Sequence, residues 1–225
     1  MKRRRSTSLL PGSLGLTGLL LAAACSTGSP RFDAPPPSWQ PFGSVWIDAG
    51  QHALMASGFV NQVSGAIELL ACGPGGKTHE SVLVLMAKPS DLHAGLLLLG
   101  LRHGPPMPDL GKGPPAGDRV RLEVEWEAGG QIRRLPAENW IRDRQTKRTP
   151  RHGGWVFNGS TFHEGKFMAD AEQSIVASYW DPWAIINIAG DVGADDERLA
   201  VQHEIIPPLH TPVRLLIRPE SKPVR

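Results

Sequence analysis

The sequence 119-RVRLEVEWEAGGQIRRL-135 decides the fold class that we expect for this chain. Every second side chain from 120 to 126 is apolar, and charged side chains stand between them, so the stretch has one apolar and one charged face as a strand. Ala128-Gly129-Gly130 then turns the chain, and residues 131–135 return beside it. The stretch therefore predicts a β-hairpin in a sheet with one buried face.

Short apolar runs on both sides of this hairpin predict further strands, at 44–47, 54–60, 66–72, 81–86, 155–157, 166–168, 174–177 and 213–217. One helix interrupts them, at about 90–101. Ser90 is its expected N-cap, and Pro105-Pro106 cannot continue it. We therefore predict an α+β fold, with one β-rich domain over residues 42–220 and this main helix packed on a sheet.

The first 24 residues have the pattern of a secretory signal peptide. A basic cluster, Lys2 to Arg5, precedes an apolar stretch over 9–24 that contains Pro11. This stretch is shorter than the roughly 20 apolar residues that a membrane span needs. Ala22-Ala23-Ala24 and Cys25 follow, and this order resembles the lipobox of bacterial lipoproteins, in which the cysteine is acylated. The sequence therefore predicts an exported protein anchored by a lipid on Cys25.

Two interpretations of this cysteine stay open. Leu21 lies four residues before Cys25 rather than three, and the alanines also suit ordinary signal peptidase, which would leave a secreted thiol. If Cys25 is acylated, Ser26 favours the outer membrane in an organism that has one, because aspartate at that position favours retention on the inner membrane. Residues 25–41 are rich in proline and predict an extended tether.

Composition excludes several functional classes. Loss of the signal removes four of the 24 Lys and Arg residues and none of the 22 Asp and Glu residues, which leaves a net charge of −2. A nucleic-acid partner, which calls for a basic surface, is therefore not expected. Cys72 is the one cysteine besides Cys25, so neither a disulfide nor an iron–sulfur cluster is predicted, and we expect no cofactor. The basic segment 142–152 and the acidic run 191–197 are predicted to be solvated loops.

The loop between the predicted strands 66–72 and 81–86 is the main candidate for function. It carries Lys77, His79, Glu80 and Ser81 after a glycine-rich turn. A histidine beside a hydroxyl or a carboxylate is part of many hydrolytic and metal sites. Ordinary turn chemistry explains the same residues, with Lys77 and Glu80 as a local ion pair. A structural or binding role is favoured over catalysis.

Three weaker hypotheses concern other residues. A metal ion held by His79, Glu80 and His93 lacks any recognised ligand spacing. Cys72 at the end of an apolar run is more typical of a small core residue than of a nucleophile. The cluster Trp180-Asp181-Pro182-Trp183 offers two indoles that suit stacking on a sugar ring, although covering the edge of the core is the commoner role of such residues.

Several stretches in combination resemble the YdjY-domain family of bacterial envelope proteins. They are 65-GAIELLA-71, 77-KTHES-81, 88-KPSDLHA-94, 155-WVFNGS-160, 168-MAD-170 and 211-TPV-213. The resemblance implies a place in the cell envelope and no particular activity. Two functional hypotheses follow. The first is a lipid-anchored, non-catalytic module that binds an envelope protein or a glycan. The second is a hydrolytic or metal-assisted envelope enzyme that uses Lys77, His79, Glu80 and Ser81.

Overall fold

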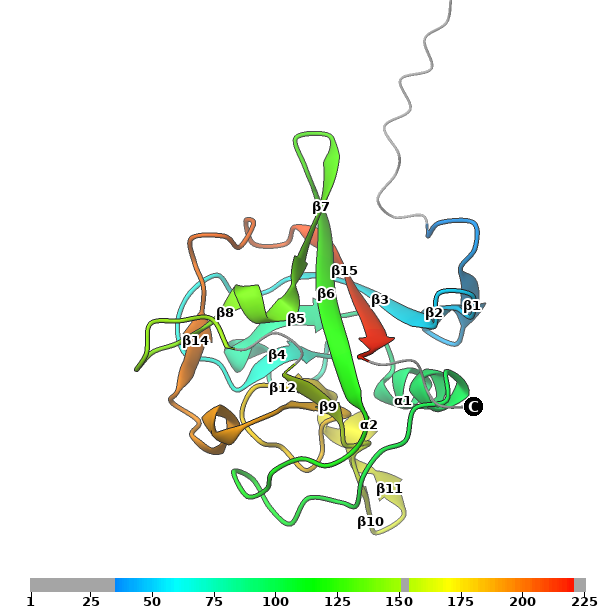
Figure 1. The fold of residues 1–225 in the computed structure, drawn as a ribbon, viewed down its shortest axis with the longest axis vertical. Helices are drawn as coiled ribbons and strands as arrows, with labels where there is room; N and C mark the ends of the chain where they lie inside the picture. The colour runs from blue at the N-terminus through cyan, green and yellow to red at the C-terminus, as the bar shows by residue number, and fades with distance from the viewer. Residues whose placement is uncertain (1–34, 151–153, 221–225) are drawn as a thin grey trace, which may run out of the picture.

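The computed structural model describes residues 35–150 and 154–220, and within them eight strands close into a barrel (Figure 1). Around the barrel the strands are β3 (Ala53–Val60), β15 (Pro212–Pro219), β6 (Arg119–Ala128), β9 (Trp155–Phe157), β13 (Ile186–Ile188), β12 (Ser174–Ala177), β4 (Leu69–Cys72) and β5 (Ser81–Leu85). The antiparallel pair β3–β5 completes the circle and aligns Gly58 with Leu85 and Val60 with Leu83. Most neighbours are antiparallel, whereas β12–β13 and β4–β5 are parallel.

Smaller elements surround the barrel. Strands β1 (Gln40–Phe42) and β2 (Val45–Asp48) extend the sheet beyond β3, and β7 (Gln131–Pro136) pairs with β6 alone. Two separate ribbons are formed by β10 (Phe162–His163) with β11 (Lys166–Phe167), and by β8 (Ile141–Asp143) with β14 (Leu199–Val201). The helices are α1 (Pro89–Leu98) and α2 (Met168–Glu172), and the 3₁₀ turns are η1 (Thr78–Glu80), η2 (Ala137–Trp140) and η3 (Asp191–Ala194).

The prediction of an α+β fold with a helix packed on a sheet was wrong, because the sheet curls on itself and closes. Helix α1 contacts β2, β3 and α2 beside the barrel rather than covering an open sheet (Figure 1).

The N-cap of α1 is Lys88, with Pro89 as the first helical residue, not Ser90 as predicted. The Ser90 amide instead donates to Asp170 Oδ1 of α2, at 2.8 Å. A carboxylate distant in the sequence therefore accepts a hydrogen bond from one of the N–H groups that lack a partner within the first turn of α1.

The alternation predicted for β6 is confirmed. Its apolar side chains point into the barrel, where Trp126 meets the fully buried Trp140 edge to face at a centroid distance of 5.3 Å. The outer face of β3 is also covered, because Met55 packs with Trp39 and Leu216 in an apolar cluster separate from the main core. The N-terminal hairpin β1–β2 continues the sheet beyond β3, with Trp46 paired to Met55.

Candidate functional site

Lys77 is the centre of the candidate loop. Its Nζ lies 2.9 Å from Glu68 Oε2 and 3.1 Å from Glu80 Oε1, and these two carboxylates are largely shielded from solvent. Burial alone would lower the pKa of Lys77, but its hydrogen bonds to Glu68 and Glu80 outweigh that effect and raise it. The ammonium group therefore forms ion pairs that connect the loop with the segment before β4. The pair with Glu80 is the local ion pair expected from the sequence, whereas the pair with Glu68 was not predicted.

The other loop residues point in different directions. The Ser81 hydroxyl is fully buried and donates to the Leu83 carbonyl at 2.9 Å, whereas 79% of the His79 side chain is exposed. His79 Nε2 lies 3.8 Å from Glu80 Oε2, beyond hydrogen-bonding distance. The loop therefore brings Lys77 and Glu80 together and does not place Ser81 beside a base. Cys72 is buried next to this loop, and burial raises the pKa of its thiol, which disfavours the reactive thiolate.

The residues suggested as metal ligands do not assemble. His79 and Glu80 precede β5, and His93 lies in α1, which follows β5, so the length of a strand separates them. Within residues 35–150 and 154–220 no three His, Cys, Asp or Glu side chains are grouped closely enough to hold a metal ion. The arrangement gives this hypothesis no support.

His93 instead lies among aromatic rings. Its ring centroid is 5.3 Å from that of Phe167, 5.4 Å from Phe157 and 5.5 Å from His103. Its Nε2 is buried and has no hydrogen-bond partner within residues 35–150 and 154–220. Burial, together with the neighbouring charge of His103, lowers the pKa of His93 to about 4. The side chain therefore acts as a neutral packing group at neutral pH.

The Trp180–Trp183 segment turns most of its side chains inward. Trp180 is 5% exposed and donates through Nε1 to the Ile188 carbonyl at 3.0 Å. Asp181 is 7% exposed and accepts hydrogen bonds from the Ser174 hydroxyl at 2.6 Å and the Trp183 amide at 2.8 Å. Only Trp183 is partly exposed. The two indoles therefore do not form the exposed stacking platform considered from the sequence.

Asp181 belongs to a buried polar network that the sequence did not reveal. Asn187 in β13 accepts from the Asp181 amide at 2.8 Å and donates through Nδ2 to Asn158 Oδ1 at 2.7 Å. Asn158 in turn donates to the Ala184 carbonyl at 3.0 Å. In the sequence, Asn158 stood out only as part of the motif 155–160, and Asn187 lies in a strand too short for pattern analysis. The network fixes the path of the chain between β12 and β13.

Replacement of Asp181 by alanine should lower the free energy of unfolding by about 2 kcal/mol. The change leaves the buried Ser174 hydroxyl without an acceptor, which costs about 1–3 kcal/mol, and also removes the acceptor of the part-buried Trp183 amide. Burial raises the pKa of Asp181, and removing this costly carboxylate offsets part of that loss. Urea denaturation at pH 7 measures the change. Asp181→Asn is the matched control. It should lose less stability, because the amide oxygen of the asparagine can still accept a hydrogen bond. Equal losses in the two variants would contradict this account.

The basic and acidic segments meet at one end of the molecule. Arg198 donates to Asp143 Oδ2 at 2.9 Å, and this hydrogen bond lowers the pKa of Asp143 to about 2. Arg144 Nη1 donates to the Glu197 carbonyl at 2.8 Å. The basic segment begins in β8 and the acidic run precedes β14, and these two strands pair, so the two predicted loops lie side by side. A cleft of about 340 Å³ between them is lined by Thr146, Ile188 and Asp191 among others, and none of the predicted site residues lines it.

The predicted signal peptide and Cys25 lie outside the described residues. Among the helices that the structure describes, none combines the length and the apolar character required to cross a bilayer.

Several of the motifs that carry the family resemblance contact one another in the fold. Glu68 of the first motif pairs with Lys77 of the second, and Lys88 of the third lies 3.6 Å from Asp170 of the fifth. No curated protein and no solved structure matches the chain. The family model of the YdjY domain matches residues 45–218, which is most of the chain and nearly all of the barrel. The protein therefore belongs to the YdjY-domain family.

Proposed function

We propose that this protein is a lipid-anchored component of the bacterial cell envelope that acts as a non-catalytic binding or accessory module. The anchor is supported by the order of the N-terminal sequence, a basic cluster, an apolar stretch, small residues and Cys25. Proline residues at 30, 35, 36 and 37 suit a tether between that anchor and the barrel. The domain would then face the periplasm or the cell surface.

The geometry of the candidate loop is the observation that favours binding over chemistry. Lys77 is neutralised by two carboxylates, and the Ser81 hydroxyl is buried. Among the described residues, none offers the exposed His79 ring an activating partner within hydrogen-bonding distance. A nucleophile needs a base within hydrogen-bonding reach, and this loop supplies none to Ser81. Its side chains instead hold the loop against the barrel.

Replacement of Cys25 by alanine should move the protein from the membrane fraction to the soluble fraction, because no other part of the proposal holds it on a bilayer. Acylated chains partition strongly into membranes through their buried methylene groups. Fractionation with immunoblotting measures the shift, and mass spectrometry of the native N-terminus should show a diacylglyceryl thioether on Cys25. Cys72→Ala is the matched control and should leave the distribution unchanged. An unmodified Cys25 thiol would point to simple secretion instead.

A further inference from the structure

The hairpin β6–β7 projects beyond the barrel and leaves one strand edge uncovered (Figure 1). β7 pairs with β6 along its whole length, from Gln131 opposite Ala128 to Pro136 opposite Glu123, and pairs with no other described strand. Apart from the adjoining residues, no atom of the described chain lies within 4 Å of where a side chain at Gly129 or Gly130 would begin, so the tip of the hairpin contacts nothing else. In the large sheet, β1 is the other outer strand, and it is short and contains Pro41.

The turn fixes which backbone groups of β7 face outward. Gly129 and Gly130 have φ values of 61° and 73°, which identify a two-residue type I′ turn. In such a hairpin the residues that flank the turn, Ala128 and Gln131, exchange hydrogen bonds, and every second pair after them does the same. The N–H and C=O groups of Ile132 and Arg134 therefore point away from β6. Pro136, which has no N–H, occupies the next outward position.

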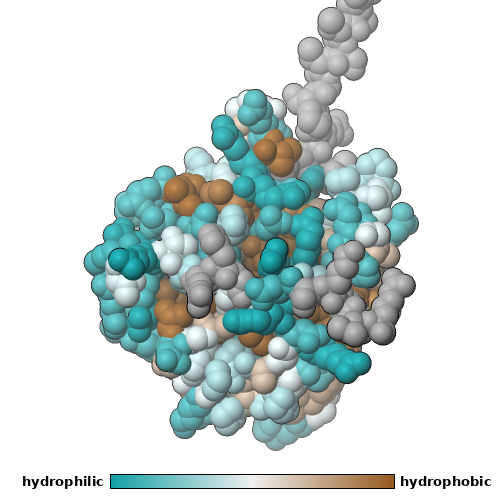
Figure 2. Space-filling view, viewed as in Figure 1, coloured by the Kyte–Doolittle hydropathy of each residue, from teal (hydrophilic) through white to brown (hydrophobic). Residues whose placement is uncertain are grey.

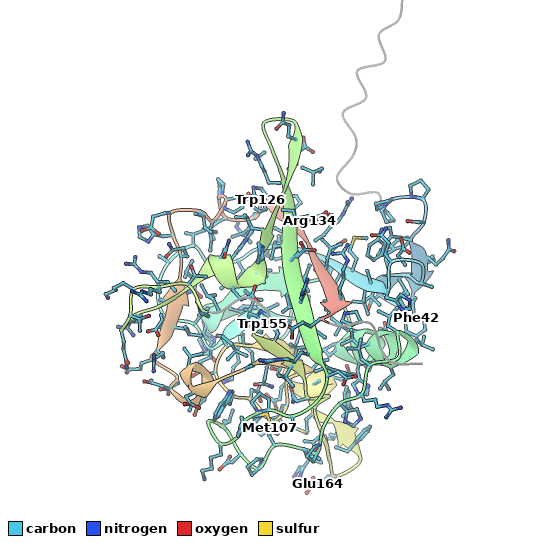
Figure 3. The ribbon with its side chains drawn as sticks, in the orientation of Figure 1. Phe42, Met107, Trp126, Arg134, Trp155 and Glu164 are labelled. Carbon is cyan, nitrogen blue, oxygen red and sulfur yellow. The ribbon has the colours of Figure 1, made fainter. Side chains whose placement is uncertain are left out.

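The side chains of β7 indicate what this edge accommodates. Ile132 is 47% exposed, and Figure 2 shows a hydrophobic group on the projecting hairpin amid hydrophilic atoms. Arg134, near the base of the hairpin in Figure 3, pairs with Glu125, whereas Arg133 has no ion pair with any described residue. β7 itself carries no acidic residue. A second copy paired along this edge would bring arginines of both copies together, which is unfavourable in a sheet.

We propose that the free edge of β7 is the docking site for an extended, acidic segment of a partner protein, which adds a strand to the hairpin. Main-chain hydrogen bonds to Ile132 and Arg134 supply the pairing, as in other cases of strand addition. An acidic side chain of the segment compensates Arg133, and an apolar one covers Ile132. This inference rests on the proposed binding role and names the class of partner. It does not depend on the lipid anchor.

A defined peptide tests the proposal without knowledge of the natural partner. The probe is an acetylated ten-residue peptide of alternating glutamate and threonine, added to the full-length protein. We expect amide exchange measured by NMR to slow at Ile132 and Arg134, whose N–H groups face outward. The amides of Gln131 and Arg133, already bonded to β6, should change little. A peptide with lysine in place of glutamate, which reverses the charge, should bind at least about tenfold more weakly. A peptide with alternate amides N-methylated, which removes main-chain donors, should bind more weakly by a similar factor.

A substitution in β7 provides the matched test on the protein. Ile132→Pro removes one outward N–H and no hydrogen bond to β6. It should therefore weaken binding of the acidic peptide by about tenfold, while the melting temperature of the protein stays near that of the parent. Ile132→Val keeps the N–H and should bind as the parent does. Unchanged exchange at Ile132 and Arg134, or equal binding of the acidic and basic peptides, would overturn the proposal.

Protection of Ile132 and Arg134 that rises with protein concentration in the absence of peptide would assign the edge to a second copy, which also overturns it. The peptide experiments test only the edge of β7, and membrane fractionation of Cys25→Ala tests only the anchor. A failure of the docking proposal can therefore be distinguished from a failure of the anchor proposal.

Discussion

Replacement of Gly58 by alanine should destabilise the domain by about 3 kcal/mol or more, the upper end of the range for overpacked sites. Gly58 lies in β3 opposite Leu85 of β5, in the pair that closes the barrel. A Cβ at this position would overlap the Val84 carbonyl oxygen and lie 2.8 Å from the Leu85 Cα. Both contacts are with backbone, which cannot rotate away as a side chain can. The strands must therefore separate at the one place where the sheet joins itself.

Ser57→Ala is the matched control, because Ser57 is the exposed neighbour of Gly58 in the same strand. It should change the free energy of unfolding by less than about 0.5 kcal/mol. Urea denaturation of the two variants and the parent provides the comparison. If Gly58→Ala gives insoluble protein, its yield relative to Ser57→Ala reports the same effect. A Gly58→Ala protein as stable as the parent would show that β3 and β5 are not packed this closely.

Acidification from pH 7 to pH 4 should remove about 3 kcal/mol of stability through His93 alone. The pKa of His93 is about 4 in the folded protein and 6.5 in the unfolded chain. The unfolded state therefore binds the proton more tightly, and stability that is fully present above pH 6.5 is lost as the pH falls toward 4. Each pKa unit corresponds to about 1.4 kcal/mol, which gives the expected magnitude.

His93→Phe removes this titration and retains an aromatic ring among Phe157, Phe167 and His103. The informative quantity is the difference between the stabilities at pH 7 and pH 4, since any change in packing affects both equally. This difference should shrink by about 3 kcal/mol in the variant. His79→Gln is the control, because it replaces a histidine that is exposed and lies outside this aromatic cluster. An equal pH dependence in His93→Phe and the parent would refute the assignment.

The local elements were predictable from the sequence, whereas barrel closure was not. The hairpin over 119–135 was predicted because alternation and a glycine turn encode it within one segment. Closure depends on pairs such as Gly58 with Leu85 and Ser174 with Cys72, which no local pattern specifies. Strand β9 was predicted at 155–157 from three consecutive apolar residues, whereas β13, which is equally short, was not, because Asn187 interrupts its apolar residues. The long helical pattern at 90–101 then suggested a second layer that the structure does not contain.

The candidate loop was predictable in part for the same reason. The pairing of Lys77 with Glu80 follows from their separation of three residues, and the structure contains it. The participation of Glu68 and the burial of the Ser81 hydroxyl depend on β4 lying beside β5 and could not be inferred locally. The network of Asn158, Asp181 and Asn187 was missed because three separate segments contribute one residue each.

The position of β15 in the barrel has a consequence for the order of folding. β15 lies between β3 and β6 and pairs Phe59 with Pro212 and Leu54 with Ile217, so the last strand of the barrel joins one of the first. A chain that emerges N-terminus first can pair β3 with β5 early, but the opposite edge of β3 waits for residues 212–219. That edge runs through Leu54 and Met55 and is apolar. Such late, non-local pairing slows folding and exposes an aggregation-prone strand. Until residues 212–219 pair with β3, this strand is a binding site for a holding chaperone that recognises extended apolar strands.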